Sequence, residues 1–151
     1  MQATIVEPIR GRDVGRILVQ MKVENYGDLE MLHRGALPAE QVRSLELTAL
    51  VDTGAKYVSL PPSEIARLGL RHLKTKTART AAGPVEQKIY SPVRVTVQER
   101  DAVNDVAELP EGSPPLLGQI PLEQMDFWID VTNQKLVGNP EHGGQWMIDQ
   151  F

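Results

Sequence analysis

The chain contains no cysteine among its 151 residues. Disulfide scaffolds, thiol nucleophiles and cysteine-ligated zinc or iron–sulfur sites are therefore excluded. Basic residues are not in excess either, because 16 Lys and Arg stand against 20 Asp and Glu, for a formal net charge of -4. Domains that bind nucleic acids normally carry a basic excess, so we expect no nucleic-acid partner. We expect no membrane-surface role either, because such modules carry polybasic clusters.

Aromatic residues are scarce and long apolar runs are missing. Phe, Trp and Tyr make up 5% of the chain, so the core must be built mainly from Val, Leu and Ile. No stretch approaches the roughly 18 apolar residues of a membrane span. The polar segment 1–16 has no apolar run of the signal-peptide type. The sequence therefore predicts a cytoplasmic protein without a membrane partner.

The sequence contains no motif that is typical of a metal site, a nucleotide site or a serine nucleophile. The three histidines, His33, His72 and His142, lack the spacing of metal ligands. No Gly-rich phosphate loop occurs, and no serine lies in a Gly-x-Ser-x-Gly turn. We expect neither a metal nor a cofactor.

Frequent proline and glycine, 11 and 12 residues, favour short strands over long helices. Alternating apolar and polar residues predict strands at 17–23 and 45–51, with a turn at 25–28 and then a loop. Further strands are expected at 75–80, 85–90, 93–97, 101–109, 116–117, 127–131 and 135–137, and short helices at 64–68 and 121–125. This pattern predicts a mainly β, closed barrel-like domain with one or two short helices.

The segment most informative about function is Leu50-Val51-Asp52-Thr53-Gly54-Ala55. A carboxylate here leaves an apolar strand and enters a tight turn, where Gly54 permits close approach of backbone amides. Acid–base hydrolysis needs such a carboxylate, held rigidly beside a water molecule. The simpler interpretation of Asp52 is an ordinary Asx-type turn at a strand end.

A second carboxylate is needed for peptide hydrolysis by this route. Two carboxylates that share one proton supply a base and an acid at the same pH. Asp-Thr-Gly occurs once in the chain. A catalytic interpretation therefore predicts a homodimer with the site on its two-fold axis.

The sequence resembles the retropepsin-like aspartic proteases, single-domain homodimeric relatives of pepsin. The resemblance rests on Val51 to Ala55, on a hairpin tip around Ala82-Gly83, and on Leu116-Leu117-Gly118 followed by a short helix. It covers about residues 45–137. It implies a closed retropepsin-type acid protease fold, a cleft at the dimer interface that takes a peptide or protein substrate, and hairpin flaps that fold over it.

The resemblance also implies a set of site residues. The catalytic residues would be Asp52, Thr53 and Gly54, and the substrate-binding residues Ala55, Ala82, Gly83 and Leu117. Thr53 would bond across the two-fold axis, and Leu117 would also pack beneath the Asp52 turn. Val58, Ile89 and Leu117 are candidates for an apolar cleft lining, which would favour hydrophobic side chains in the substrate.

Two departures from the viral pattern point toward the bacterial branch of the family. Lys56 stands where the viral enzymes have an acidic residue, and Gln119 stands where they have an arginine. The hairpin tip, residues 81–84, is also stiffer than the glycine-rich viral flap. These departures favour an alternative function, a catalytically weak or inactive dimeric module that binds peptides or supports assembly.

The remaining features concern the ends of the chain and one basic stretch. We expect a single domain over 1–151, with an N-terminal arm at 1–16 and a tail at 138–151 that docks on the second subunit. The basic stretch contains Arg67, Arg71, His72, Lys74, Lys76 and Arg79. We interpret it as a solvated face, since no aromatics are interleaved to stack on bases. Binding of nucleic acid or of an acidic substrate is the alternative.

Overall fold

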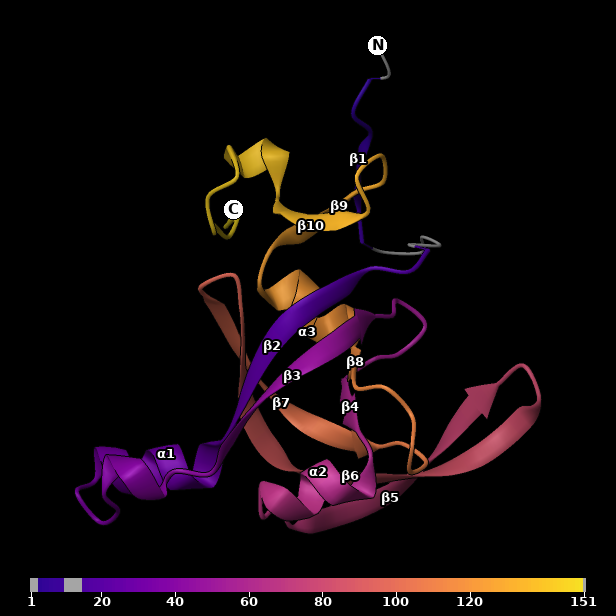
Figure 1. The fold of residues 1–151 in the computed structure, drawn as a ribbon. Helices are drawn as coiled ribbons and strands as arrows, with labels where there is room; N and C mark the ends of the chain where they lie inside the picture. Colours follow the sequence, from indigo (N-terminus) through magenta and orange to yellow (C-terminus); the bar gives the residue numbers. More distant parts are fainter. Residues whose placement is uncertain (1–2, 10–14, 151) are drawn as a thin grey trace.

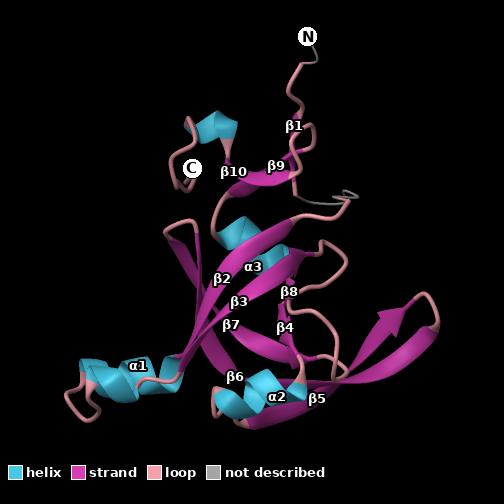
Figure 2. Ribbon diagram, in the orientation of Figure 1, coloured by secondary structure: helices cyan, strands magenta, loops and turns pink. Residues whose placement is uncertain are grey.

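A computed structural model describes residues 3–9 and 15–150 and shows a mainly β protein (Figures 1 and 2). The strands are β1 Val6–Pro8, β2 Leu18–Asn25, β3 Ser44–Val51, β4 Val58–Leu60, β5 His72–Thr80, β6 Gly83–Val97, β7 Arg100–Glu108, β8 Leu116–Leu117, β9 Phe127–Asp130 and β10 Lys135–Gly138. The helices are α1 Tyr26–His33, α2 Pro62–Arg67 and α3 Gln119–Gln124, with 3-10 turns at Ala39–Gln41 and Pro140–His142. The mainly β prediction is confirmed.

The larger sheet closes on itself into a barrel. Its strand order is β2-β3-β8-β4-β7-β6-β5, and β2 also pairs with β6. The closing contact is antiparallel and aligns Val23 of β2 with Val95 of β6. Both valines are fully buried, because the two-residue period of each strand turns one set of side chains into the barrel. β5 stays outside the closed ring and continues the sheet beyond β6 (Figure 1).

The expected hairpin between residues 75 and 90 is present and projects from the barrel (Figure 1). β5 and β6 pair antiparallel, with Thr80 opposite Gly83, so Ala81 and Ala82 form the turn. The hydroxyl of Thr80 donates to the carbonyl of Gly83 at 2.6 Å. Gly83 has a φ of +111°, which favours glycine at the tip. We call β5, this tip and the first half of β6 the flap hairpin.

The turn expected at 25–28 is wrong, because these residues begin helix α1. The side chain of Asn25 accepts a hydrogen bond from the Asp28 amide at 3.0 Å and caps the helix. An Asn at the end of a strand favours a turn and a helix cap alike. Its amide group also donates to the carbonyl of Leu68 at 2.8 Å. This contact joins the start of α1 to the end of α2, a tertiary contact that the local sequence does not reveal.

The helix expected at 64–68 is present but begins two residues earlier. α2 starts at Pro62 with Pro61 in the cap position, and no side chain caps it. Ser63 donates its hydroxyl to Glu111 at 2.8 Å. Gly69, with a φ of +65°, follows the last turn.

An ion pair beneath α1 should make stability depend on acid pH. The guanidinium of Arg43 donates two hydrogen bonds of 2.9 Å to the buried carboxylate of Asp28, and holds the pKa of that carboxyl below its ordinary value. Because this pKa is lowered, the ion pair stabilises the fold at pH values above the ordinary pKa of about 3.9. The stabilisation is lost as the pH falls through the pKa of the folded state. Asp28→Asn should cost roughly 1–3 kcal/mol at pH 7 and flatten the acid limb of unfolding curves. Glu40→Gln, at an exposed carboxylate, should leave that limb unchanged.

A small sheet lies at one end of the barrel, beyond α3 (Figure 1). β9 pairs with β10 in the expected terminal hairpin, and β1 joins β9 on its other side. β1 was not predicted, because three residues carry too little periodicity. It forms within the segment expected to be an arm, of which residues 1–2 and 10–14 lie outside the described residues. None of the described helices has the length and apolar character needed to cross a lipid bilayer.

The described part of the tail, Gly138 to residue 150, folds back onto the end of α3. His142 Nδ1 lies 2.5 Å from Oδ2 of Asp126, and its Nε2 lies 3.1 Å from a carboxylate oxygen of Asp149. The indole of Trp146 donates to the carbonyl of Gln124 at 3.0 Å. The tail is thus held by a histidine between two carboxylates.

The attachment of this tail should weaken as the pH rises. Asp126 and Asp149 raise the pKa of His142 above its ordinary value. Because this pKa is raised, protonated His142 stabilises the attached tail at pH values below its ordinary pKa of about 6.5. The stabilisation is lost as the pH rises through the pKa of His142 in the folded protein. Amide exchange over residues 143–150, followed from about pH 6 to 9, should accelerate beyond its intrinsic pH dependence. In His142→Gln that extra acceleration should be absent; an equal acceleration in both proteins would contradict the prediction.

Candidate active site

The Asp52 loop, residues 52–57, leaves the barrel where β3 ends. β3 runs parallel to the short strand β8, with Val51 opposite Leu117. The amide of Asp52 donates to the carbonyl of Leu117 at 3.0 Å. β8 also pairs with β4 on its other side. The chain before and after the loop is therefore fixed to one central strand.

The carboxylate of Asp52 is half-buried and is held by its own turn. Its Oδ1 accepts a hydrogen bond from the amide of Gly54 at 2.8 Å, and its carbonyl accepts one from Ala55 at 3.2 Å. The bond to the carboxylate is charge-assisted and fixes the rotamer. The same bond occurs in ordinary Asx turns. The case for a functional site therefore depends on what surrounds the loop.

The far side of the loop is fixed by the segment that follows β8. Amides at the start of α3 donate to the loop carbonyls, Gln119 to Ala55 at 2.9 Å and Ile120 to Lys56 at 3.0 Å. Gly118 passes so close that a Cβ there would lie 2.4 Å from the carbonyl oxygen of Tyr57. Only glycine fits this contact, because an added Cβ would meet backbone atoms of the loop.

A hollow of about 420 Å³ separates the Asp52 loop from the flap hairpin. We call it the loop–hairpin hollow. It is lined by Gly54, Ala55, Lys56, Tyr57, Ser59, Lys76, Thr77, Ala78, Arg79, Thr80 and Gln87. The two walls come from segments about twenty residues apart in the sequence. They meet where the Nζ of Lys76 donates to the hydroxyl of Tyr57 at 3.2 Å.

The structure brings only some of the expected site residues to this hollow. Gly54 and Ala55 line it, and Asp52 and Thr53 lie half-buried in the same loop. Ala82 and Gly83 lie at the hairpin tip, outside the described lining. Which of these residues contact a substrate stays a prediction.

The apolar lining expected for the cleft is not found in this hollow. Val58, Ile89 and Leu117 are 0%, 1% and 0% exposed, so all three belong to the core. Leu117 packs beneath the loop, as the motif also implied. Their β strands put them there, because alternate residues of a closed barrel point inward.

The hollow contains residues that the sequence did not assign to the site. Lys76, Arg79 and Tyr57 contribute to its walls. The signal available in the sequence is the basic stretch over residues 67–79. One of its members, Lys76, faces the loop and bonds to Tyr57.

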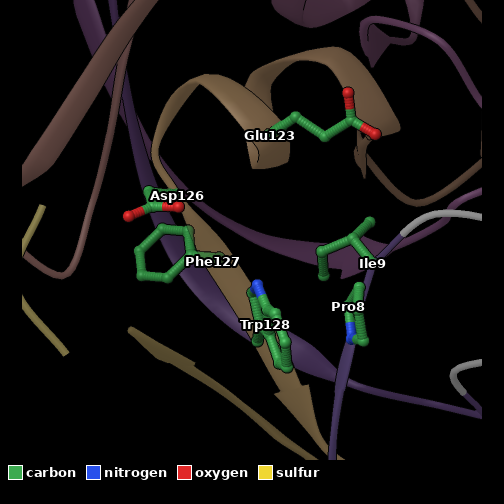
Figure 3. A pocket seen from close by; sticks show the side chains of 6 residues that line it. All are labelled: Pro8, Ile9, Glu123, Asp126, Phe127 and Trp128. Carbon is green, nitrogen blue, oxygen red and sulfur yellow. The ribbon is translucent and has the colours of Figure 1, made fainter. Parts of the chain in front are cut away.

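A separate hollow of about 360 Å³ lies between β1 and the α3–β9 segment (Figure 3). Pro8, Phe127 and Trp128 contribute apolar walls, and Asp126 lies at its edge. The carboxylate of Asp126 is engaged by His142. Glu123 also lines this hollow, and its carboxylate accepts a hydrogen bond from Gln119 at 3.0 Å. In the part of the chain that the structure describes, no three His, Asp or Glu side chains gather closely enough to hold a metal ion.

Asp52 thus ends an apolar strand in a loop whose next residues, Gly54 and Ala55, line a hollow bounded by the flap hairpin. The model of the gag-polyprotein putative aspartyl protease family matches residues 41–124, more than half of the chain. The chain therefore belongs to this retropepsin-like aspartic protease family. The matched region contains the Asp52 loop, the flap hairpin and α3.

Solved structures are also similar to the chain. The solution structure of Simian Foamy Virus (mac) protease is similar to the chain at 19% identity, with a TM-score of 0.44. The similarity covers 70% of this chain and 91% of that one. No curated protein matches the chain.

Proposed function

We propose that the protein is an aspartic endopeptidase that hydrolyses peptide bonds as a homodimer. The observation that carries this proposal is the Asp52 loop itself, fixed from three sides and open toward a hollow bounded by the flap hairpin. Membership in an aspartyl protease family supports it. Because each chain has one Asp-Thr-Gly, a pair of catalytic aspartates requires two copies.

In the proposed mechanism two Asp52 side chains, one from each copy, bind one water molecule. The ionised carboxylate takes a proton from the water as it attacks the scissile carbonyl carbon, while the protonated one transfers its proton to the carbonyl oxygen. The intermediate is a tetrahedral diol, which collapses when the newly protonated carboxyl gives its proton to the leaving nitrogen and the other carboxylate takes one back from a diol hydroxyl. No covalent bond to the enzyme forms. Thr53 would bond across the two-fold axis, and the Gly54 amide keeps each carboxylate in place.

The tail at 138–151 is proposed to contribute to the dimer. Trp146, Met147 and Ile148 are 44%, 49% and 79% exposed in the single chain. Clustered apolar side chains at a surface commonly mark an interface. A chain truncated after Gly144 should therefore dimerise more weakly, as measured by sedimentation.

The alternative is a dimeric peptide-binding or assembly module with weak or no turnover. The observation that favours it concerns the two departures from the viral pattern, Lys56 and Gln119. Gln119 donates to Glu123 of its own helix at 3.0 Å, and Lys56 is exposed. These positions thus make no viral-type ion pair with each other. The same departures support our proposal that the chain lies on the bacterial branch of the family.

Cleavage of a mixed peptide pool distinguishes the two functions. The wild-type protein and Asp52→Asn are compared from about pH 4 to 7, the range in which carboxylate pairs share a proton. Site-specific cutting by the wild type alone supports the endopeptidase. No cutting by either, with the dimer intact, supports the binding module.

A further inference from the structure

The loop–hairpin hollow is cationic. Lys56 lines it from the Asp52 loop, and Lys76 lines it from β5. Both residues are exposed. None of the described residues that line the hollow is an aspartate or a glutamate. The surface that a bound peptide would meet beside Asp52 therefore carries positive charge, although the whole chain has a net charge of -4.

The charge of Lys76 is not neutralised by its neighbour across the strands. Lys76 stands opposite Gln87, which also lines the hollow, whereas Arg79 stands opposite Pro84 on the other face of the hairpin. The nearest carboxylate along this part of β6, Glu86, stands opposite Thr77 and lines a different hollow, near Pro110.

The ammonium of Lys76 is positioned by an uncharged group. It bonds to the hydroxyl of Tyr57 at 3.2 Å and lies 5.6 Å from the centre of the same ring. An aromatic face attracts a cation without cancelling its charge. The contact therefore holds a net positive charge between the hairpin and the loop.

We infer that this hollow selects peptides with acidic side chains next to the bond to be cut. The inference rests on the proposed function and names its substrate class. A carboxylate near the ammonium groups of Lys56 and Lys76 gains Coulomb energy that a neutral side chain of the same size does not gain. Nucleic acid is the less suitable polyanion, because Tyr57 is the one aromatic residue of the described lining and stacking of successive bases needs several.

The test uses two peptide pools that are identical except that every Glu and Asp of one is replaced by Gln and Asn in the other. We expect kcat/KM of the wild type to be about fivefold to tenfold higher on the acidic pool, as a few exposed charge pairs would give. Lys56→Glu and Lys76→Glu should abolish or reverse this ratio, and Lys76→Arg should keep it. Arg34→Glu is the matched control, since it makes the same change of charge at an exposed residue after α1.

Binding to the Asp52→Asn protein, measured by fluorescence anisotropy with the same pools, separates the two proposals. Cleavage of both pools at equal rates overturns the inference but still supports the proposed endopeptidase function. If the wild type cuts neither pool, the proposed function fails, and binding decides the inference. Tighter binding of the acidic pool that is lost in Lys76→Glu supports it. Equal binding, or preferential binding of a single-stranded oligonucleotide, overturns it.

Discussion

Replacing Asp52 by Asn should lower kcat/KM for peptide cleavage by roughly 10²–10⁴-fold or more, the range that a general acid or base contributes. An amide cannot take a proton from water, so the pair loses its base. The fold should persist, because Asn can still accept the hydrogen bond that Gly54 donates to Oδ1 at 2.8 Å. Asp101→Asn, at an exposed aspartate of β7, should leave the rate unchanged.

Mixing subunits tests whether two copies of Asp52 act together. If wild-type and Asp52→Asn chains pair at random in equal amounts, about one quarter of the dimers contain two aspartates. Activity should then fall to about that fraction rather than to one half. Activity proportional to the wild-type fraction would show that each chain works alone and would contradict the proposed mechanism.

Gly118→Ala should destabilise the protein by roughly 3 kcal/mol, the upper part of the usual range for forcing an extra methyl group into a packed site. The added Cβ would lie 2.4 Å from the Tyr57 carbonyl oxygen and 2.7 Å from that of Ala55. Both obstacles are backbone, so neither can rotate away. Relief requires the Asp52 loop to move, and cleavage should fall along with the denaturant midpoint.

Gly27→Ala is the control for this substitution. Gly27 lies in the first turn of α1, and the atom closest to its added Cβ is a side-chain oxygen of Asn25 at 3.2 Å. Alanine favours helix over glycine by up to about 1 kcal/mol, so stability should change little. Equal losses of stability in the two variants would mean that the close approach at Gly118 is not what holds the loop.

Much of the barrel could be predicted because its strands carry their pattern locally. The alternation of buried and exposed residues in β2 and β3, and the hairpin tip between Thr80 and Gly83, each follow from a few adjacent residues. α1 could not be predicted in this way. The same Asn25 side chain that caps it also fits a simple turn, and its contact with Leu68 is 43 residues distant.

The Asp52 loop was found from the sequence, but the walls of the hollow were not. The position of Asp52 follows from three adjacent residues after an apolar strand. Lys76 and Tyr57 face each other because of the order of β5 and β4 in the sheet, and no local sequence pattern specifies this order. A cationic wall was therefore interpreted as solvated surface, and an apolar lining was expected where the structure has core.

The closure of the barrel has a consequence for solubility. Among the described strands of the larger sheet, β5 alone has a single partner, so its outer edge presents backbone groups to other chains. Lysine and arginine on such an edge oppose intermolecular strand pairing and aggregation. Lys74, Lys76 and Arg79 lie on this edge. Replacing them with neutral residues to broaden the range of substrates would therefore also increase the tendency to form intermolecular sheets.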